Sequence, residues 1–181
     1  MEKANLVHGV FDSVAPKYDL MNDLTSFGIH RFWKASFLTW LRPEPAIKLI
    51  DVGGGTGDIA FGFLEDGGGQ VTIVDNNEKM LTVGRERALD RGHLKNINWI
   101  NADAENLPLC DSTFDIYAIA FCLRNVTNIE SALRDARRVL KPGGRFMCLE
   151  FSHVASPLLE SIYNSYSFKI LPEIGKYIAQ D

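Results

Sequence analysis

The feature that most constrains the fold is a glycine-rich turn between a short apolar run and a helical pattern. Residues 51–58 read Asp-Val-Gly-Gly-Gly-Thr-Gly-Asp, and a helix is expected to begin near Ile59. Glycines let the main chain turn sharply and approach a ligand closely, because a Cβ would strike the ligand or forbid the required dihedral angles. An ordinary strand-to-helix turn needs only one glycine. The segment therefore predicts a nucleotide-binding loop.

Short apolar runs alternate with helical patterns along the rest of the chain. We expect strands at residues 47–52, 71–75, 97–101, 114–120 and 144–151, with a helix in each interval. Unbroken apolar runs are typical of strands that are buried on both faces. The pattern predicts an α/β protein with a doubly wound, Rossmann-like, mostly parallel sheet.

Helical segments are also expected outside this sheet. Residues 6–41 have a helical pattern with breaks at Pro16 and Gly28, and the segment ends at residues 42–45. We expect an N-terminal helical cap over residues 1–45 and one continuous core over residues 46–181. Residues 158–170 read as an amphipathic helix.

Two acidic residues follow predicted strands at the edge where the glycine turn lies. Asp75 ends the second strand about 20 residues after the glycines, where nucleotide-binding folds place a carboxylate that accepts hydrogen bonds from ribose hydroxyls. Asp103 follows the third strand, where an adenine amino group would donate to it, and Ala104 would offer its backbone N–H. A solvated surface residue is the alternative at both acidic positions.

The order of residues in the loop favours S-adenosylmethionine over a dinucleotide. The segment from Asp51 to Gly57 has the order Asp-x-Gly-x-Gly-x-Gly, whereas the dinucleotide fingerprint is Gly-x-Gly-x-x-Gly. Asp58 stands at the start of the helix, where its charge would oppose a pyrophosphate but not a sulfonium zwitterion.

Composition excludes several other classes of protein. The 19 basic and 23 acidic residues are interspersed and give a net charge of -4, so nucleic acid is not an expected partner. The three cysteines form no CxxC pair, which argues against disulfides and a metal site. No run of about 18 apolar residues is present, so no membrane span is expected, although peripheral contact stays open.

Taken together, the motifs resemble those of the ubiquinone/menaquinone biosynthesis C-methyltransferase family, within the class I S-adenosylmethionine-dependent methyltransferase fold. The narrowest are Lys-Tyr-Asp-Leu-Met-Asn at residues 17–22 and Leu-Arg-Asn-Val-Thr at residues 123–127. The similarity extends over residues 11–23, 28–34, 51–58, 123–127, 139–144, 149–152 and 166–168.

The resemblance implies an enzyme that transfers the methyl group of S-adenosylmethionine to a ring carbon of a prenylated hydroquinone. The acceptor would be 2-polyprenyl-6-methoxy-1,4-benzoquinol, demethylmenaquinol or both. The expected cofactor-binding residues are Asp51, Gly53, Gly55, Thr56, Gly57, Asp75, Asn76, Asp103, Ala104 and Ala120. Many bacterial members of the family have Ser at the position of Ala120, so only a backbone contact is expected there.

The candidate catalytic residues are Arg124, Tyr18 and Asn22. Arg124 follows the fourth strand and is expected to face the crevice, where its guanidinium would stabilise a phenolate. Tyr18 and Asn22 belong to the cap and are candidate proton relays or ring contacts. For His30, helix packing and a relay role are both open, with packing favoured.

Four aromatic residues in the cap have roughly helical spacing: Phe27, Phe32, Trp33 and Phe37. This spacing favours a hydrophobic core over a groove for a prenyl chain.

Relatives continue past the position of residue 181 into antiparallel strands that complete the sheet, so these strands are expected to be absent here. That absence would favour a rival hypothesis, a shortened, non-catalytic S-adenosylmethionine-binding or scaffold subunit of a quinone-synthesis assembly. Another rival is a methyltransferase of a different small molecule. The resemblance also implies a cytoplasmic protein peripheral to the inner membrane, or alternatively one on the mitochondrial matrix side, and a possible homodimer or quinone-synthesis complex.

Overall fold

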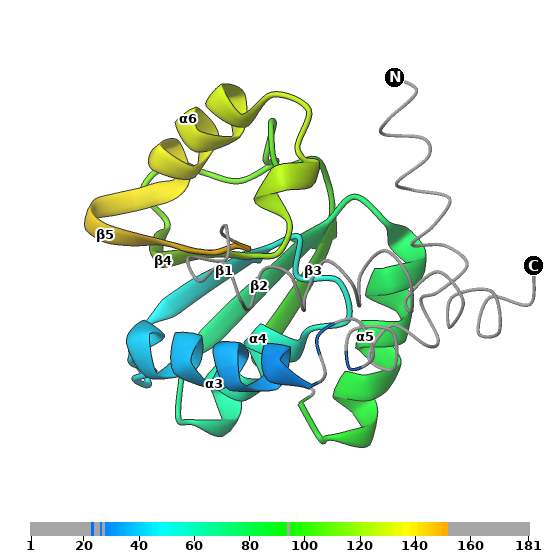
Figure 1. The fold of residues 1–181 in the computed structure, drawn as a ribbon. Helices are drawn as coiled ribbons and strands as arrows, with labels where there is room; N and C mark the ends of the chain where they lie inside the picture. The colour runs from blue at the N-terminus through cyan, green and yellow to red at the C-terminus, as the bar shows by residue number, and fades with distance from the viewer. Residues whose placement is uncertain (1–22, 24–25, 27, 94, 152–181) are drawn as a thin grey trace, which may run out of the picture.

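A parallel sheet forms the centre of the computed structural model, which describes residues 23, 26, 28–93 and 95–151 (Figure 1). Within these residues the strand order is β3-β2-β1-β4-β5, and each neighbouring pair is parallel. The strands are β1 Lys48–Val52, β2 Gln70–Asp75, β3 Ile97–Asn101, β4 Phe114–Ala120 and β5 Leu140–Leu149. The chain runs outward from β1 to β3 and then returns to β4 on the other side of β1. This reversal makes the carboxyl ends of β1 and β4 the switch point, where open α/β sheets bind ligands.

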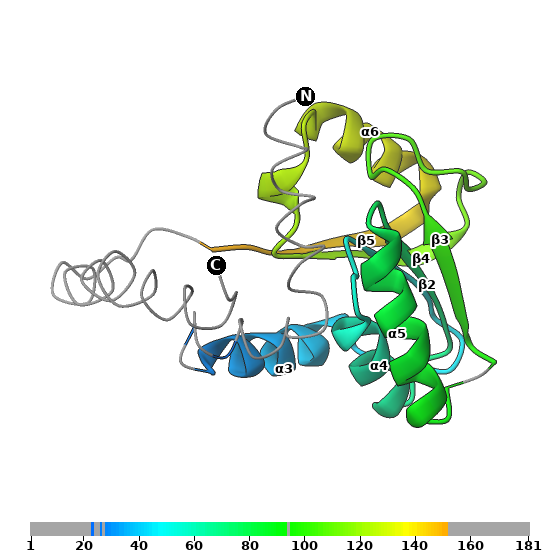
Figure 2. The ribbon, with the colours of Figure 1, turned by 90° about the vertical axis from the view of Figure 1, so that its right-hand side faces the viewer.

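Helices cover both faces of this sheet. The helices α3 Ile29–Leu41, α4 Asp58–Glu65 and α5 Glu78–Asp90 pack on one face, and α6 Ile129–Val139 packs on the other (Figure 2). A short 3-10 helix, η2 Leu123–Asn125, follows β4. The doubly wound arrangement predicted from the sequence is confirmed.

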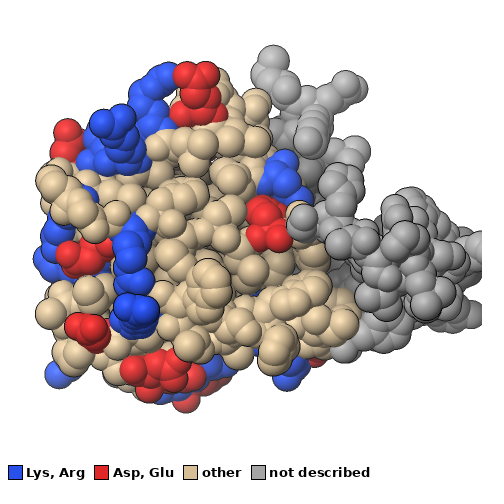
Figure 3. Space-filling model, turned by 60° about the vertical axis from the view of Figure 1, so that its left-hand side comes forward, with Lys and Arg blue, Asp and Glu red and all other residues tan. Residues whose placement is uncertain are grey.

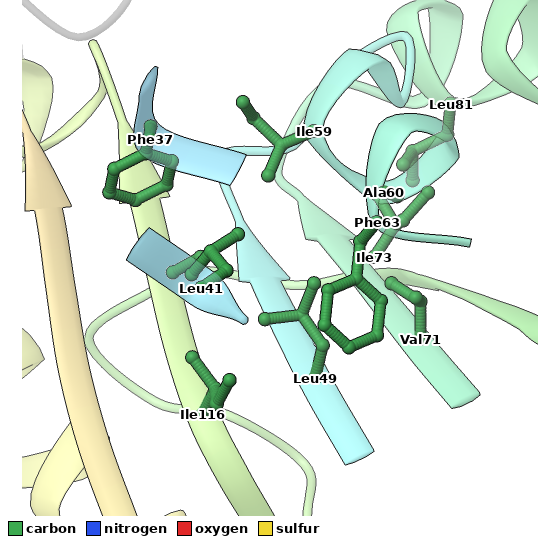
Figure 4. Packing of buried hydrophobic residues seen from close by; sticks show 11 residues of the cluster. Phe37, Leu41, Leu49, Ile59, Ala60, Phe63, Val71, Ile73, Leu81 and Ile116 are labelled. Carbon is green, nitrogen blue, oxygen red and sulfur yellow. The ribbon is translucent and has the colours of Figure 1, made fainter. Parts of the chain in front are cut away.

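Apolar side chains alternate between the two faces and so build two cores. In β1, Leu49 belongs to the first core, whereas Ile50 and Val52 belong to the second. Each fully buried aliphatic or aromatic side chain of this size contributes roughly 1.5–3 kcal/mol. The first core consists of Phe37, Leu41, Leu49, Ile59, Ala60, Phe63, Val71, Ile73, Leu81, Ile116 and Ala118 (Figure 4).

The helix α3, from the predicted cap, is an integral part of the first core. Phe37 and Leu41 are buried against residues of β1 and α4 (Figure 4). The Arg145 guanidinium in β5 donates to the carbonyl oxygens of Trp40 and Leu41 at 3.0 and 2.6 Å. The helix is therefore attached to the sheet by packing and by hydrogen bonds at its carboxyl end.

The first four strands were predicted within one residue, but the fifth begins four residues earlier than expected. Leu140 already pairs with Phe114, and the ladder resumes only where Arg145 pairs with Ile116. The extra residues bulge out of the ladder around Gly143, which has a φ of 81°. The predicted start at residue 144 therefore missed the contact between Leu140 and Phe114, which extends β5 toward its amino end.

The prediction of a helix in every interval is wrong between β3 and β4. Residues 102–113 form turns, with the Asp103 carboxylate accepting from the Glu105 amide and Ser112 at a φ of 50°. Asp103 competes with a helix by bonding to the nearby backbone, and Pro108 lacks the donor that a helix interior requires. The segment covers the second core with Ala104 and Leu107 instead.

Some predicted elements lie outside the described residues. These are the helical pattern over residues 6–22 and the amphipathic helix at residues 158–170, and Phe27 also lies outside them. Among the described residues, no helix is long and apolar enough to cross a membrane.

Candidate functional site

A pocket opens at the carboxyl edge of the sheet, at the switch point. The glycine loop forms one wall, and the segments that follow β2, β3 and β4 form the others. Its described lining is Val52, Gly53, Gly54, Gly55, Val74, Asp75, Asn76, Asn77, Met80, Ala102, Asp103, Ala104, Glu105, Ala120, Phe121, Cys122, Asn125, Val126 and Thr127. This lining contains three carboxylates and no Lys or Arg, so the pocket suits a ligand with positive charge.

The glycine loop lies against the segment that follows β4. The amides of Gly53 and Gly54 donate to the Val74 carbonyl at 2.7 and 3.3 Å, which holds the loop over β2. Gly53 has a φ of 66°, and a Cβ on it would overlap the Cys122 Sγ. Only glycine satisfies both conditions at this position.

Asp75 is held at the end of β2 by two backbone amides. Its Oδ2 accepts from the Gly55 amide and its Oδ1 from the Asn77 amide, both at 2.9 Å. Each carboxylate oxygen has a further lone pair, so these bonds orient the side chain without exhausting its capacity to accept ribose hydroxyls. Asn77 in turn caps α5, since its Oδ1 accepts from the amides of Lys79 and Met80.

Asp51 lies beneath the loop and is 1% exposed. Its Oδ2 is buried and has no hydrogen-bond partner among the described residues. Burial, with the nearby charges of Asp58 and Asp75, raises the pKa of Asp51 to about 7. A Cβ on Gly54, which lines the pocket, would come within 2.9 Å of this oxygen. An unsatisfied buried acid behind the loop fits a ligand that brings a cationic donor, such as the ammonium group of S-adenosylmethionine.

Asp58 occupies the amino end of α4, where a dinucleotide would place its pyrophosphate. Its Oδ2 accepts from the Lys34 ammonium at 2.6 Å, and its Oδ1 lies 3.7 Å from the Arg87 guanidinium. Burial opposes ionisation, but Lys34 holds the pKa of Asp58 below its ordinary value. A carboxylate therefore already occupies the anion position of this helix, which argues against a dinucleotide.

The adenine side of the pocket is formed by the turn after β3. The Asp103 Oδ1 accepts from the Glu105 amide at 2.9 Å, and Ala104 is almost fully buried. The Glu105 Oε1 accepts from the Asn128 amide at 2.7 Å, which ties this turn to the start of α6. Asp103 lines the pocket, and its contact with an adenine amino group stays a prediction.

The segment after β4 turns through a strained residue. Phe121 has a φ of 56°, a left-handed conformation that is costly for a residue with a Cβ, and its amide donates to the Leu149 carbonyl at 2.7 Å. The next residue, Cys122, contacts the glycine loop. Burial raises its thiol pKa to about 12, so the thiol stays protonated and is not a nucleophile at neutral pH.

Arg124 was predicted to face the crevice, and the structure places it at the rim. Its side chain is 46% exposed and donates to the Glu150 Oε2 at 2.5 Å. The guanidinium lies over the Phe151 ring, 4.9 Å from the centroid. It is not among the described lining residues, and its role toward a phenolate stays a prediction.

The predicted cofactor residues fall into two groups. Seven of them line the pocket: Gly53, Gly55, Asp75, Asn76, Asp103, Ala104 and Ala120. The other three, Asp51, Thr56 and Gly57, belong to the same segment but are not among the described lining residues. The Thr56 Oγ1 accepts from the Arg87 guanidinium at 3.1 Å. Direct contact of each residue with the cofactor stays a prediction, and Tyr18 and Asn22 lie outside the described residues.

Sequence reasoning missed the wall formed by Phe121, Cys122 and residues 125–127. The signal that was available is their position directly after the fourth strand, because carboxyl ends of neighbouring parallel strands meet at one edge. His30, by contrast, is buried, with its Nδ1 2.8 Å from the Ser26 Oγ, as expected for a helix-packing histidine.

The fold and the pocket together define the class of protein. A S-adenosylmethionine-dependent methyltransferase from Aquifex aeolicus has a similar structure, with a TM-score of 0.60 and 23% identity over 78% of this chain and 77% of that chain. The strand order, the acidic pocket and the glycine loop are those of a Rossmann-like class I methyltransferase, and S-adenosylmethionine is the methyl donor.

The chain belongs to the ubiE/COQ5 methyltransferase family, whose model matches residues 1–181. It is 53% identical over 184 residues to the ubiquinone/menaquinone biosynthesis C-methyltransferase UbiE of Brucella abortus, covering 99% of this chain and 68% of that protein. It is 50% identical over 181 residues to the UbiE protein of Cereibacter sphaeroides, covering 99% of this chain and 72% of that protein. The resemblance inferred from the motifs is confirmed.

Proposed function

We propose that the chain transfers a methyl group from S-adenosylmethionine to a ring carbon of a prenylated hydroquinone, in the biosynthesis of ubiquinone, menaquinone or both. Membership of the family and the names of its curated relatives support this reaction. The structural observation that carries it is the acidic pocket at the switch point, with Asp75 and Asp103 on two neighbouring strand ends.

The chain binds and orients the methyl donor and the quinol, and none of its side chains needs to act as a nucleophile. S-adenosylmethionine supplies, when bound, a methyl group activated by its sulfonium. In the transfer the methyl–sulfur bond would break as the bond to the ring carbon forms, which leaves S-adenosylhomocysteine as a neutral thioether, and the proton that the ring carbon loses would pass to water. Correct orientation of two reactants is worth effective molarities of about 10⁵ M or more, so no covalent intermediate is needed.

The ring carbon becomes a better nucleophile when a neighbouring hydroxyl ionises. A free phenol has a pKa of about 10 and is mostly protonated at neutral pH. Arg124, which forms an ion pair with Glu150, would stabilise the phenolate electrostatically. Tyr18 and Asn22 remain proposed as ring contacts or proton relays in the cap.

The prenylated acceptor also supports peripheral contact with a membrane. On α3, Ile29 and Phe32 are 49% and 72% exposed, an arrangement suited to shallow insertion at a lipid surface. The face drawn in Figure 3 has a broad area without charged side chains, bordered by charges of both signs. We infer that the protein works at the cytoplasmic face of an inner membrane. A matrix-side location, a homodimer and a quinone-synthesis complex stay predictions, as does the expected lack of a nucleic-acid partner.

Isothermal titration with S-adenosylmethionine and, in parallel, with NADH tests the cofactor assignment. We expect binding of the methyl donor alone, weakened by about 1–3 kcal/mol in Asp75→Ala, the usual loss on removal of a charged hydrogen-bond partner. Because Asp75 also holds two backbone amides, Asp103→Asn serves as a second variant with a smaller structural effect. Binding of NADH but not of the methyl donor would overturn the assignment.

Product formation separates the enzyme from a non-catalytic, cofactor-binding subunit. Incubation with S-adenosylmethionine and a short-chain demethylated quinol should yield a ring-methylated product, detected by mass spectrometry. Cofactor binding without any methylated product would favour the scaffold hypothesis. Methylation of other phenols in preference to the quinol would favour a methyltransferase of another small molecule.

A further inference from the structure

Three aromatic rings meet beside the cofactor pocket and outside both cores. The Trp33 ring lies 5.6 Å from the Phe151 ring in an edge-to-face arrangement and 6.3 Å from the Phe121 ring, between ring centroids. The Phe121 and Phe151 centroids are 4.9 Å apart. None of the three belongs to either hydrophobic core, and we call them the aromatic cluster.

The topology of the sheet explains why these rings meet. Phe121 follows β4 directly and Phe151 follows β5 closely, and the ends of these strands are in register because Ala120 pairs with Leu149. Trp33 reaches the same edge from α3. Its neighbour Lys34 fixes this end of the helix to the start of α4 through Asp58.

The cluster adjoins the pocket and remains accessible. Phe121 lines the pocket, whereas Phe151 is 49% exposed and carries the Arg124 guanidinium over its ring. The left-handed backbone of Phe121 costs free energy, and such strained residues cluster at ligand sites. A cluster that served only packing would bury its rings, whereas here Phe151 is half exposed and Trp33 and Phe121 are only partly buried, which indicates a role in binding.

We propose that Trp33, Phe121 and Phe151 form the binding surface for the aromatic ring of the methyl acceptor, and that Trp33 and Phe151 set the affinity for that ring. A flat hydroquinone stacks favourably on aromatic side chains. The Arg124–Glu150 ion pair at the rim offers both a donor and an acceptor to ring hydroxyls. The acceptor ring must also reach the methyl group of the donor. Phe121 belongs both to the aromatic cluster and to the lining of the cofactor pocket. This inference rests on the proposed function, because it names where the acceptor of that reaction binds.

Steady-state kinetics with a soluble quinol that carries one prenyl unit tests the assignment in the full chain. We expect Trp33→Leu and Phe151→Leu each to raise the acceptor KM about tenfold, the scale of one lost aromatic contact, with S-adenosylmethionine binding within about twofold of wild type. Trp33→Phe should restore most of the affinity, because it keeps an aromatic ring. The matched control is Trp40→Leu, on the same helix about 10 Å further along its axis and 71% exposed, which should behave as wild type. An unchanged acceptor KM in both Trp33→Leu and Phe151→Leu would overturn the proposal.

Fluorescence gives a readout that does not depend on methyl transfer. The oxidised form of the same compound should quench tryptophan emission with a saturable dependence on its concentration. This quenching should be lost in Trp33→Phe and kept in Trp40→Phe. Quenching that persists in Trp33→Phe would contradict the ring site. Absence of methylation by a wild-type chain that shows this quenching would instead count against the proposed reaction alone.

Discussion

Three carboxylates around the glycine loop have the same chemistry and three different environments. Asp51 is buried, and one of its oxygens has no hydrogen-bond partner in the described part of the chain. Asp58 is paired with Lys34, and Asp75 accepts from two backbone amides. Burial therefore raises the pKa of Asp51, whereas Lys34 more than offsets the effect of burial at Asp58 and lowers its pKa. The site therefore holds one acid whose pKa is raised and another whose pKa is lowered.

The raised pKa of Asp51 makes stability depend on pH. The unfolded chain ionises this group near its ordinary pKa of 3.8, whereas the folded chain holds the proton until about pH 7. Its contribution to stability is therefore present below about pH 4 and is lost as pH rises toward 7, by a few kcal/mol in total. Thermal unfolding should show Asp51→Asn gaining stability over wild type at pH 8 and little at pH 4. Parallel pH profiles of the two proteins would contradict this prediction.

The contact between Gly53 and Cys122 predicts a large effect of one methyl group. Gly53→Ala adds a Cβ that overlaps the Cys122 side chain, on a backbone with a φ of 66°. Gly67→Ala is the matched control, because its φ is 91° but nothing lies within 4 Å of the added Cβ. We expect chemical denaturation to show a loss of about 1–2 kcal/mol for the control, from backbone strain. Gly53→Ala should lose roughly 1–3 kcal/mol more, from overpacking, and should bind S-adenosylmethionine weakly. Equal losses would show that the clash is relieved without cost.

At the scale of elements, α3 contributes residues to both parts of the site. Its carboxyl half packs into the first core through Phe37 and Leu41. Its amino half presents Trp33 to the aromatic cluster and Lys34 to Asp58. The helix thus places a residue of the aromatic cluster and the residue that pairs with Asp58 at consecutive positions.

The ion pair between Lys34 and Asp58 should couple more strongly than an exposed pair. The two side chains are 15% and 28% exposed, so water screens them little. A double-mutant cycle with Lys34→Met and Asp58→Asn should give a coupling free energy of about 1–3 kcal/mol. The exposed pair of Arg134 and Glu130 in α6, at 72% and 84% exposure, is the control and should give about 0.5 kcal/mol or less. Equal coupling free energies in the two pairs would mean that burial does not strengthen the ion pair between Lys34 and Asp58.

At the scale of the whole molecule, the reversal of strand order creates the site. Segments that follow β1, β2, β3 and β4 converge on one pocket, although the residues involved lie between positions 52 and 127. A ligand that bridges these segments binds the folded state only. Cofactor binding should therefore be linked to global stability.

Addition of S-adenosylmethionine should raise the thermal unfolding midpoint. At a concentration of about 100 times its Kd, the stabilisation is about 2.7 kcal/mol. For a chain of this length that corresponds to a shift of roughly 5–10 °C. Differential scanning fluorimetry measures the shift, with Asp75→Ala and NADH as the comparisons that should show little or none. An equal shift with NADH would argue against a selective methyl-donor site.

Much of the fold could be predicted from local pattern alone. Apolar runs located four strands within a residue, and Asp75 and Asp103 were located as pocket residues by their positions after strands. Local pattern failed where tertiary contacts compete with it, as at residues 102–113 and at Leu140, where pairing with Phe114 extends β5. It also assigned Phe32 and Trp33 to a core, because helical spacing does not reveal which helix face meets a partner.

The sequence by itself determined the class of fold, the family and the chemistry of the cofactor loop. The glycines, the acidic residues and the apolar periodicity are local signals that extend over a few residues, so the turns, strands and ligand contacts they indicate can be predicted from the sequence. Only the tertiary structure decided that the Asp51 Oδ2 has no hydrogen-bond partner among the described residues, that Arg124 is bound to Glu150, and that Trp33, Phe121 and Phe151 meet beside the pocket. Such contacts join residues 26 to 118 positions apart. No local rule specifies them, because they depend on which strand ends the topology places side by side.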